Sequence, residues 1–244
     1  MIDIHCHILP GVDDGSQSIE QSLRMAQLAV RSGIDTIVAT PHTNIVRMFE
    51  NYNSYRLHAR FRALKKALEK ADIPLDIVKG AEIYFDGDVV SMLEKGKIST
   101  INDSRYPLVE FSFSDQVSRV IAALRSLIDA GYTPIVAHPE RYHFIHQDIS
   151  LLRTFTDMGC VLQINKGSPL GRFGDMPQKI SRWMLDQGLV HIIASDAHSD
   201  IHRTPNCSSI YDFLYDTYGD GCPRLLLDIN PEHIINDEPI ESVL

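Results

Sequence analysis

The chain opens with MIDIHCHILPGVDDG, residues 1–15, in which apolar and ligand-type side chains alternate. Isoleucine or cysteine at the even positions from 2 to 8 alternates with Asp3, His5 and His7. A period of two is typical of a β-strand, whose successive side chains point to opposite faces. We therefore expect a strand over residues 2–8 that presents two imidazoles on one side, where they can share a metal ion.

Six further short apolar runs follow this strand, and stretches with helical character separate them. The expected strands cover residues 35–40, 77–83, 108–111, 134–138, 161–164 and 190–195, and the expected helices cover residues 17–32, 55–71, 116–130, 150–158, 177–187 and 208–218. Several of these helices stop at a glycine, namely Gly33, Gly131, Gly159 and Gly188, where positive φ can close a helix. The alternation of strands and helices predicts a parallel, barrel-like sheet.

Length and composition favour one globular domain over residues 1–244. The chain has 244 residues, of which 44% are hydrophobic, and its formal net charge of −9 disfavours a nucleic-acid substrate. No apolar run approaches the roughly 20 residues needed to span a bilayer, so we expect a cytoplasmic protein without membrane insertion. The four cysteines are sparse and irregularly spaced, as expected of reduced thiols. The basic run over residues 56–70 has helical spacing and is expected to be a solvated face.

Residues able to bind metal stand at or just beyond nearly every expected strand. In chain order these are His5, His7, Asp14, His42, Glu82, Glu110, His138, Asp196 and His198. In a parallel barrel the strand ends and the loops after them form the functional face, so these side chains are expected to converge on one multinuclear metal site. Mixed nitrogen and oxygen ligands suit manganese, iron or zinc better than calcium.

The same residues resemble the polymerase-and-histidinol-phosphatase (PHP) superfamily, with its opening His-x-His, later isolated His, bridging Glu and closing Asp-x-His. More narrowly, the chain resembles the bacterial tyrosine-protein phosphatases of that superfamily that act beside capsule and exopolysaccharide tyrosine kinases. The matching segments are residues 1–15, TPH at 40–42, GAEIY at 80–84, INDSRYPL at 101–108, LVEFS at 108–112, AHPERY at 137–142, LGRFG at 170–174 and ASDAH at 194–198. So many segments in order make the resemblance specific.

The resemblance implies a fold, a cofactor set and an activity. The fold is a distorted (β/α)7 barrel, and the cofactors are three divalent ions, with Mn²⁺ expected and Fe or Zn as alternatives. His5, His7, Glu82 and Asp196 would hold one ion, Glu82, Glu110 and His138 a second, and Asp14, His42 and His198 a third. The implied substrate is a phosphotyrosine protein, in particular the tail of a bacterial tyrosine kinase that controls capsule or exopolysaccharide synthesis.

Two arginines are expected to bind the phosphate during attack by a metal-activated water. Arg141 follows His138 in the run His-Pro-Glu-Arg, and Arg203 follows the closing Asp-x-His. Guanidinium groups donate charge-assisted hydrogen bonds to phosphate oxygens. A structural ion pair is the alternative role for Arg141. We expect the neighbouring His202 to be a loop residue and not a ligand.

A cysteine nucleophile is disfavoured, because it would need an arginine six residues after the cysteine. The residues at that distance are Val12, Lys166, Phe213 and Asp228. Three other functions stay open: hydrolysis of histidinol phosphate or another small phosphoester, a metal-dependent nuclease activity, and a catalytically silent module that binds metal or docks a kinase.

Overall fold

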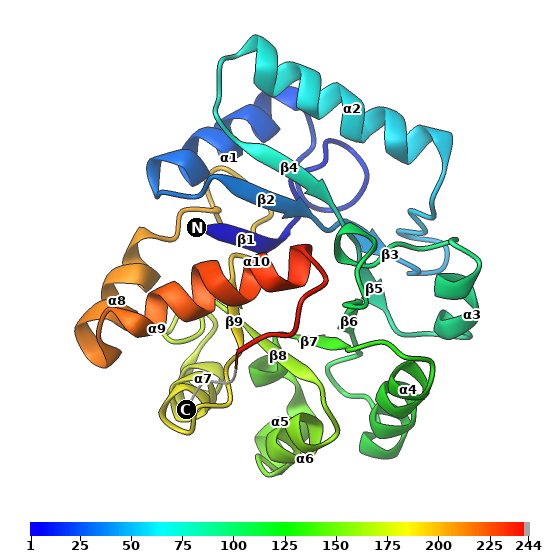
Figure 1. Ribbon diagram of the computed structural model, residues 1–244, viewed down its shortest axis with the longest axis vertical. Helices are drawn as coiled ribbons and strands as arrows, with labels where there is room; N and C mark the ends of the chain where they lie inside the picture. The colour runs from blue at the N-terminus through cyan, green and yellow to red at the C-terminus, as the bar shows by residue number, and fades with distance from the viewer. Residues whose placement is uncertain (242–244) are drawn as a thin grey trace.

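We describe the chain from a computed structural model, shown in Figure 1, in which residues 1–241 are described. Residues 242–244, which the expected domain included, lie outside the described part. The strands are β1 (Ile2–Cys6), β2 (Thr36–Ala39), β3 (His42–Thr43), β4 (Asp76–Lys79), β5 (Glu82–Tyr84), β6 (Leu108–Glu110), β7 (Ile135–Ala137), β8 (Val161–Asn165) and β9 (Ile192–Ala194). All the strand pairs are parallel, in the orders β1-β2-β4 and β3-β5-β6-β7-β8-β9.

The two sheets join into one distorted (β/α)7 barrel, as predicted. β2 and β3 are one interrupted strand, and so are β4 and β5, since Gly80 N donates to Ala39 O and Glu82 N donates to Pro41 O. At the other edge, Asp196 N donates to His5 O over 2.8 Å, which links the segment after β9 to β1. The expected strand over residues 77–83 is therefore the β4–β5 pair with a break between them.

Helices surround the strands (Figure 1). They are α1 (Ile19–Arg31), α2 (Tyr55–Lys70), α3 (Val89–Glu94), α4 (Val117–Asp129), α5 (His143–Gln147), α6 (Leu151–Asp157), α7 (Asp175–Asp186), α8 (Ser208–Tyr218), α9 (Gly221–Arg224) and α10 (Asn230–Ile235). Two short 3-10 helices, η1 (Ile101–Asp103) and η2 (Pro139–Arg141), and a π-helix, η3 (Leu225–Ile229), complete the set. The six predicted helices are confirmed as α1, α2, α4, α6, α7 and α8. The short α3 and α5 were not predicted, because they are too brief to show a helical period. The helical segment over residues 221–235, in which α9, η3 and α10 follow one another without a break, was not predicted either.

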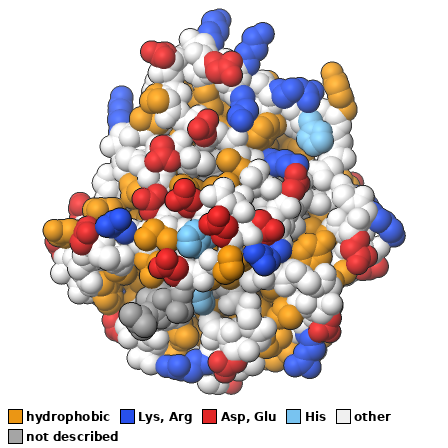
Figure 2. All heavy atoms as spheres, in the orientation of Figure 1, with side chains coloured by type: hydrophobic (Ala, Val, Ile, Leu, Met, Phe, Trp, Pro, Cys, Tyr) orange, Lys and Arg blue, Asp and Glu red, His pale blue; other side chains and the backbone are white. Residues whose placement is uncertain are grey.

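Local sequence explains where the helices begin and end. Ser18 caps α1 by accepting from Gln21 N, and Ser54 caps α2 by accepting from Leu57 N. All four glycines expected to close helices have positive φ, between 64° and 94°. The basic run lies on the exposed face of α2, and Figure 2 shows Lys and Arg side chains gathered over that helix. Among residues 1–241, no helix is both long enough and apolar enough to cross a bilayer.

Two layers fill the barrel. One, which we call the apolar layer, contains Ile4, Val38, Leu108, Ile135, Ala137, Val161, Ile192 and Ala194, and is closed by Ile101, Tyr106 and Ile234. Figure 1 shows α10, which carries Ile234, lying across this end. The other, the polar layer, lies at the carboxyl ends of the strands and contains the buried His5, His7, Glu82, His138, Gln163, Asn165 and Asp196. The opposite strand faces pack against the surrounding helices in a larger core.

A bulge in β1 joins the two layers. Asp3 pairs with Ile37 and Cys6 pairs with Ala39, so β1 has one residue more than β2 over this interval. Ile4 consequently lies in the apolar layer and Cys6 in the outer core, although strict alternation puts both on one face. Asp3 Oδ1 accepts from Ser195 N over 2.9 Å and so links the start of β1 to the segment after β9.

Candidate metal centre

The barrel gathers the nine predicted ligands at the carboxyl ends of its strands. Groups whose ligand atoms lie within 4.8 Å of one another are His5, His7 and Asp196; His42, Glu82 and Glu110; and His7, Asp14, His42 and His198. These groups include every predicted ligand except His138, which lies against Glu82. The residues come from β1, β3, β5, β6 and the segments after β1, β7 and β9, so only the closed barrel brings them together.

Glu82 is the centre of the cluster. Its Oε1 lies 3.3 Å from His5 Nε2 and 3.0 Å from His138 Nε2. Its Oε2 lies 3.2 Å from His7 Nε2 and 3.0 Å from His42 Nδ1. One buried carboxylate thus faces four imidazoles, which is the arrangement needed for a bridging ligand.

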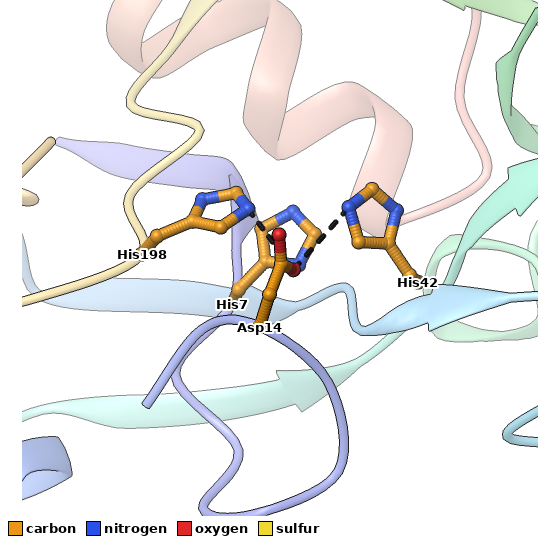
Figure 3. A group of neighbouring side chains, drawn as sticks. All are labelled: His7, Asp14, His42 and His198. Carbon is orange, nitrogen blue, oxygen red and sulfur yellow. Dashed lines mark ion pairs between the residues drawn. The ribbon is translucent and has the colours of Figure 1, made fainter. Parts of the chain in front are cut away.

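Asp14 forms the outer edge of the cluster. Figure 3 shows its carboxylate between His42 and His198, with His7 close by, and its Oδ1 is 3.5 Å from Nε2 of both His42 and His198. The Asp14 side chain is 54% exposed, whereas that of Glu82 is 1% exposed. The cluster therefore extends from the barrel interior to the surface, where a substrate can reach it.

The grouping differs in detail from the one that the family resemblance implies. His42 lies with Glu82 and Glu110 as well as with Asp14 and His198, and His7 also belongs to two groups. His138 Nε2 is 3.6 Å from Glu110 Oε1, so the implied group of Glu82, Glu110 and His138 is also compact. The three sets overlap around Glu82, and the ligand assignment stays a prediction.

Three residues that the sequence analysis did not single out hold the ligands in place. Asp13 Oδ2 lies 2.8 Å from His7 Nδ1, and Gln163 Oε1 lies 2.9 Å from His5 Nδ1. Asn165 Nδ2 donates to Asp196 Oδ2 over 2.6 Å. Such contacts fix the ring orientation of a metal-binding histidine. Gln163 and Asn165 alternate along the buried β8, and polar residues at that spacing in a buried strand were the available signal.

The loop after β1 depends on Gly15. A Cβ atom there would lie 2.3 Å from both Cβ and O of His7, so no other residue fits without displacement. Gly15 N also donates to Asp13 Oδ1. The glycine lets the loop fold back onto β1 and brings the two aspartates to the histidines.

Left-handed backbone conformations occur at three of the predicted site residues. φ is 35° at His138, 48° at Asp196 and 48° at Arg203. Residues with a Cβ adopt this conformation at a cost of about 1 kcal/mol or more. The surrounding barrel maintains these turns, which place all three side chains at the same end of the barrel.

Charges in the cluster perturb one another strongly. Burial lowers the pKa of His42, but the opposite effect of the neighbouring Glu82 carboxylate is larger, so the pKa of His42 is raised to about 9. Burial and the negative charge of Glu82 together raise the pKa of Glu110 to about 8. Metal ligands must be deprotonated, so metal binding at such a site is coupled to proton release.

The donor set fits divalent metal ions. Among residues 1–241, His42 Nδ1 and Glu82 Oε2 find no hydrogen-bond partner although both are buried and lie 3.0 Å apart. Buried polar atoms are seldom left unpaired, and two neighbouring unpaired ligand atoms suit a cation. Imidazoles mixed with carboxylates are the ligands of manganese, iron and zinc.

The two predicted arginines meet at Asp196. Arg141 Nη1 lies 3.4 Å from Asp196 Oδ2 and Arg203 Nη2 lies 2.5 Å from the same atom. The Arg141 guanidinium is 4.9 Å from the ring centroids of both Phe113 and Phe173. The Arg203 guanidinium is 6.0 Å from that of Phe173. Two cations, one carboxylate and two aromatic rings thus form a wall beside the ligand cluster. Neither phenylalanine was predicted as a site residue, although Phe173 belongs to the LGRFG segment and Phe113 directly follows LVEFS.

The remaining expectations concern His202 and the cysteines. His202 is exposed and belongs to none of the three ligand groups. All four cysteines are free thiols. Burial raises the pKa of Cys160 and of Cys207 to about 12, and that of Cys222 to about 11. Burial likewise raises the pKa of Cys6 well above its ordinary value. Thiols that stay protonated at neutral pH are poor nucleophiles.

Comparison with known proteins gives a consistent result. Residues 1–236 match the family described as capsular polysaccharide synthesis, CpsB/CapC. The chain is 39% identical to the tyrosine-protein phosphatase YwqE of Bacillus subtilis (strain 168), over 98% of this chain and 93% of the relative. It is 36% identical to the tyrosine-protein phosphatase CpsB of Streptococcus pneumoniae, over 98% of this chain and 100% of that relative. The chain also matches a crystal structure with a TM-score of 0.92 and 36% sequence identity, over 99% of this chain and 97% of that chain. That structure is one of those described as YwqE from Bacillus subtilis and CpsB from Streptococcus pneumoniae, unique metal-dependent tyrosine phosphatases.

Proposed function

We propose that this chain, which belongs to the CpsB/CapC family of capsular polysaccharide synthesis, is a metal-dependent tyrosine-protein phosphatase. Relatives with this name cover nearly the whole chain. The observation that carries the proposal is the shared position of Asp196, which lies 3.5 Å from His5 in the ligand cluster and also contacts both arginines. The proposed metal ligands and the two arginines proposed to bind phosphate therefore line one site.

In this proposal the cluster would hold three divalent ions, with Mn²⁺ expected. His5, His7, His42, His138 and His198 would supply nitrogen ligands, and Glu82, Asp196, Glu110 and Asp14 would supply oxygen ligands, with Glu82 as the shared carboxylate. When bound, such ions stabilise negative charge on phosphate oxygens and supply a nucleophile derived from water. Asp13, Gln163 and Asn165 keep the ligands in their orientation before any ion arrives, which reduces the reorganisation that binding needs.

Arg141 and Arg203 bind the phosphoryl oxygens. Guanidinium groups form two parallel hydrogen bonds to phosphate, and a positioned donor stabilises the charge that develops during transfer. Asp196 and Phe173 hold both guanidinium groups from the side, which leaves their remaining N–H groups free for phosphate. The leaving group is a tyrosine phenolate with a parent pKa of about 10, so it departs more readily than an alkoxide.

The substrate in this proposal is a phosphotyrosine protein, in particular the tail of a tyrosine kinase that controls capsule or exopolysaccharide synthesis. The family description and the names of the relatives support this assignment. Half-exposed aromatic side chains support it too: Phe113 is 37% exposed and lies beside Arg141, where a tyrosyl ring can pack. The enzyme acts in the cytoplasm, where its four free thiols stay reduced.

Turnover of two substrates by the same preparation tests the proposal. Chelated protein is reconstituted with Mn²⁺, Fe²⁺ or Zn²⁺, its metal content is measured, and kcat/KM is determined for a phosphotyrosine peptide and for histidinol phosphate. We expect activity only after reconstitution, about three ions per chain, and a preference for the peptide. A large preference for histidinol phosphate would replace this proposal with a small-molecule phosphatase. Full activity in chelated protein would remove the metals from it.

A further inference from the structure

A basic cavity lies beside the arginine wall. It has a volume of about 400 Å³ and is lined by Lys166, Arg172, His202 and Arg203, with Phe173 and Thr204 among its other walls. None of the residues that line it is acidic. Arg203 and Phe173 also belong to the wall of the metal centre, so the cavity and the centre are adjacent. In a chain with a net charge of −9, this local excess of cations is unusual.

The loop over residues 166–174, between β8 and α7, builds this cavity as a fixed structure. A Cβ atom at Gly167 would lie 2.8 Å from the Phe173 ring, so the glycine permits the ring to pack on the loop backbone. Arg172 N donates to Gly167 O over 2.9 Å. The buried Glu140 accepts from Asn165 N and from Ser168 Oγ, which ties the start of the loop to η2. The cations are therefore presented by an ordered segment.

Two of the three Lys and Arg side chains that line the cavity, Lys166 and Arg172, form no ion pair with any of residues 1–241. Lys166 Nζ donates to the carbonyl of Asn206, which is neutral, and Arg203 is paired with Asp196. For the side chains of Arg172 and His202, we find no hydrogen bond or ion pair with any residue between 1 and 241. Burial lowers the pKa of Lys166, the nearby Cys207 and Asp3 raise it, and Arg172 lowers it, so Lys166 and Arg172 lie within electrostatic reach of each other. An anion in the cavity would relieve this repulsion.

We propose that this cavity is a second anion-binding subsite, which takes an acidic side chain of the substrate close to the phosphotyrosine. The proposal rests on the phosphatase function and specifies its substrate class: peptides with a carboxylate or a second phosphate near the reactive residue. An extended peptide spans about 3.3 Å per residue, so an acidic group one to three positions away reaches from Arg203 into the cavity. Both kinds of anion form charge-assisted hydrogen bonds with Arg and Lys.

The test compares three phosphotyrosine peptides of equal length. One has neutral neighbours, one has glutamates within three residues of the phosphotyrosine, and one has a second phosphotyrosine there. For the native protein we expect KM to be about fivefold lower for the acidic peptides than for the neutral one. The glutamate and phosphotyrosine arms show which anion the subsite prefers. In Arg172→Glu the difference between acidic and neutral peptides should disappear or reverse.

Lys179→Glu is the matched control, because it makes the same charge change at an exposed position of α7 that does not line the cavity. It should preserve the native ratio of KM values. Equal KM values for all three peptides in the native protein would overturn the subsite, as would an equal loss of the ratio in both variants. Absence of phosphotyrosine hydrolysis in every peptide would instead overturn the phosphatase function, so the two failures are distinguishable.

Discussion

The two layers of the barrel interior are built from the same strands and have opposite character. Along β8, Val161 belongs to the apolar layer, whereas Gln163 and Asn165 belong to the polar layer. Along β9 and its extension, Ile192 and Ala194 are followed by Asp196 in the same way. The apolar layer stabilises the fold by burying hydrocarbon. The polar layer gathers charges whose burial is unfavourable without a cation. Stability and chemistry are thus divided along each strand.

The largest expected effect is loss of activity on changing the centre of the polar layer. Glu82→Gln keeps the volume of the side chain but removes its charge, so it should lower metal content and reduce kcat/KM by about 1000-fold or more, with the barrel retained. Metal analysis, peptide turnover and circular dichroism measure these quantities. The exposed Glu94→Gln on α3 is the control. Native metal content and turnover in Glu82→Gln would remove the bridging role.

A cavity created in the apolar layer should lower stability and leave metal binding unchanged. Ile135→Ala removes a fully buried side chain and should lower the free energy of unfolding by about 3 kcal/mol, while the folded protein binds the native amount of metal. Urea unfolding of metal-free protein measures the loss. Ile201→Ala is the control, because that side chain is 75% exposed. If Ile135→Ala lost metal in proportion to stability, the two layers would not be separable.

Removal of an arginine should affect chemistry without affecting the metals. Arg141→Ala is expected to reduce kcat/KM by about 100-fold, the usual loss for one donor to a developing charge, because the phosphate loses a guanidinium partner. Its metal content should stay native, since Arg141 touches the cluster only through Asp196. Arg141→Lys keeps the positive charge but lacks the planar guanidinium group, so its kcat/KM should lie between that of the native protein and that of Arg141→Ala. Native kinetic constants in Arg141→Ala would assign it a structural role.

The pH dependence of stability gives a smaller effect outside the metal centre. Burial lowers the pKa of His191 to about 4, while its Nδ1 accepts from Leu162 N. Below pH 6.5 the unfolded chain binds a proton that the folded chain does not, so stability falls as the pH decreases toward 4. This group alone should cost about 2 kcal/mol between pH 7 and pH 5. His191→Asn should show a shallower decline in urea unfolding; identical slopes would contradict the assignment.

The smallest expected effect concerns the aromatic support of the arginines. Phe173→Leu removes a ring that lies against both guanidinium groups, and a cation–π contact is worth about 1 kcal/mol or less, so kcat/KM should fall about threefold. Phe213→Leu is the control, because Phe213 supports Arg182 away from the site. Equal effects in both variants would show general destabilisation and not positioning of the arginines.

Much of the fold and of the proposed ligand set could be predicted from local sequence patterns. Period-two alternation in β1, helix-closing glycines such as Gly33, and ligand-type residues at strand ends predicted the barrel and its polar end, because each pattern depends on neighbouring residues alone. The motif order from His5 to His198 also identified the family, now confirmed by the match over residues 1–236.

Tertiary structure alone decided how these residues group. The bulge in β1, which puts Ile4 in the apolar layer and Cys6 in the outer core, follows from pairing with β2. The position of Asp196 between two arginines, and the packing of Phe113 and Phe173 on Arg141, join segments far apart in the chain. Barrel closure and loop packing set such distances, and no local spacing encodes them. The sequence therefore determined which residues face the chemistry, and the closed barrel determined which of them touch.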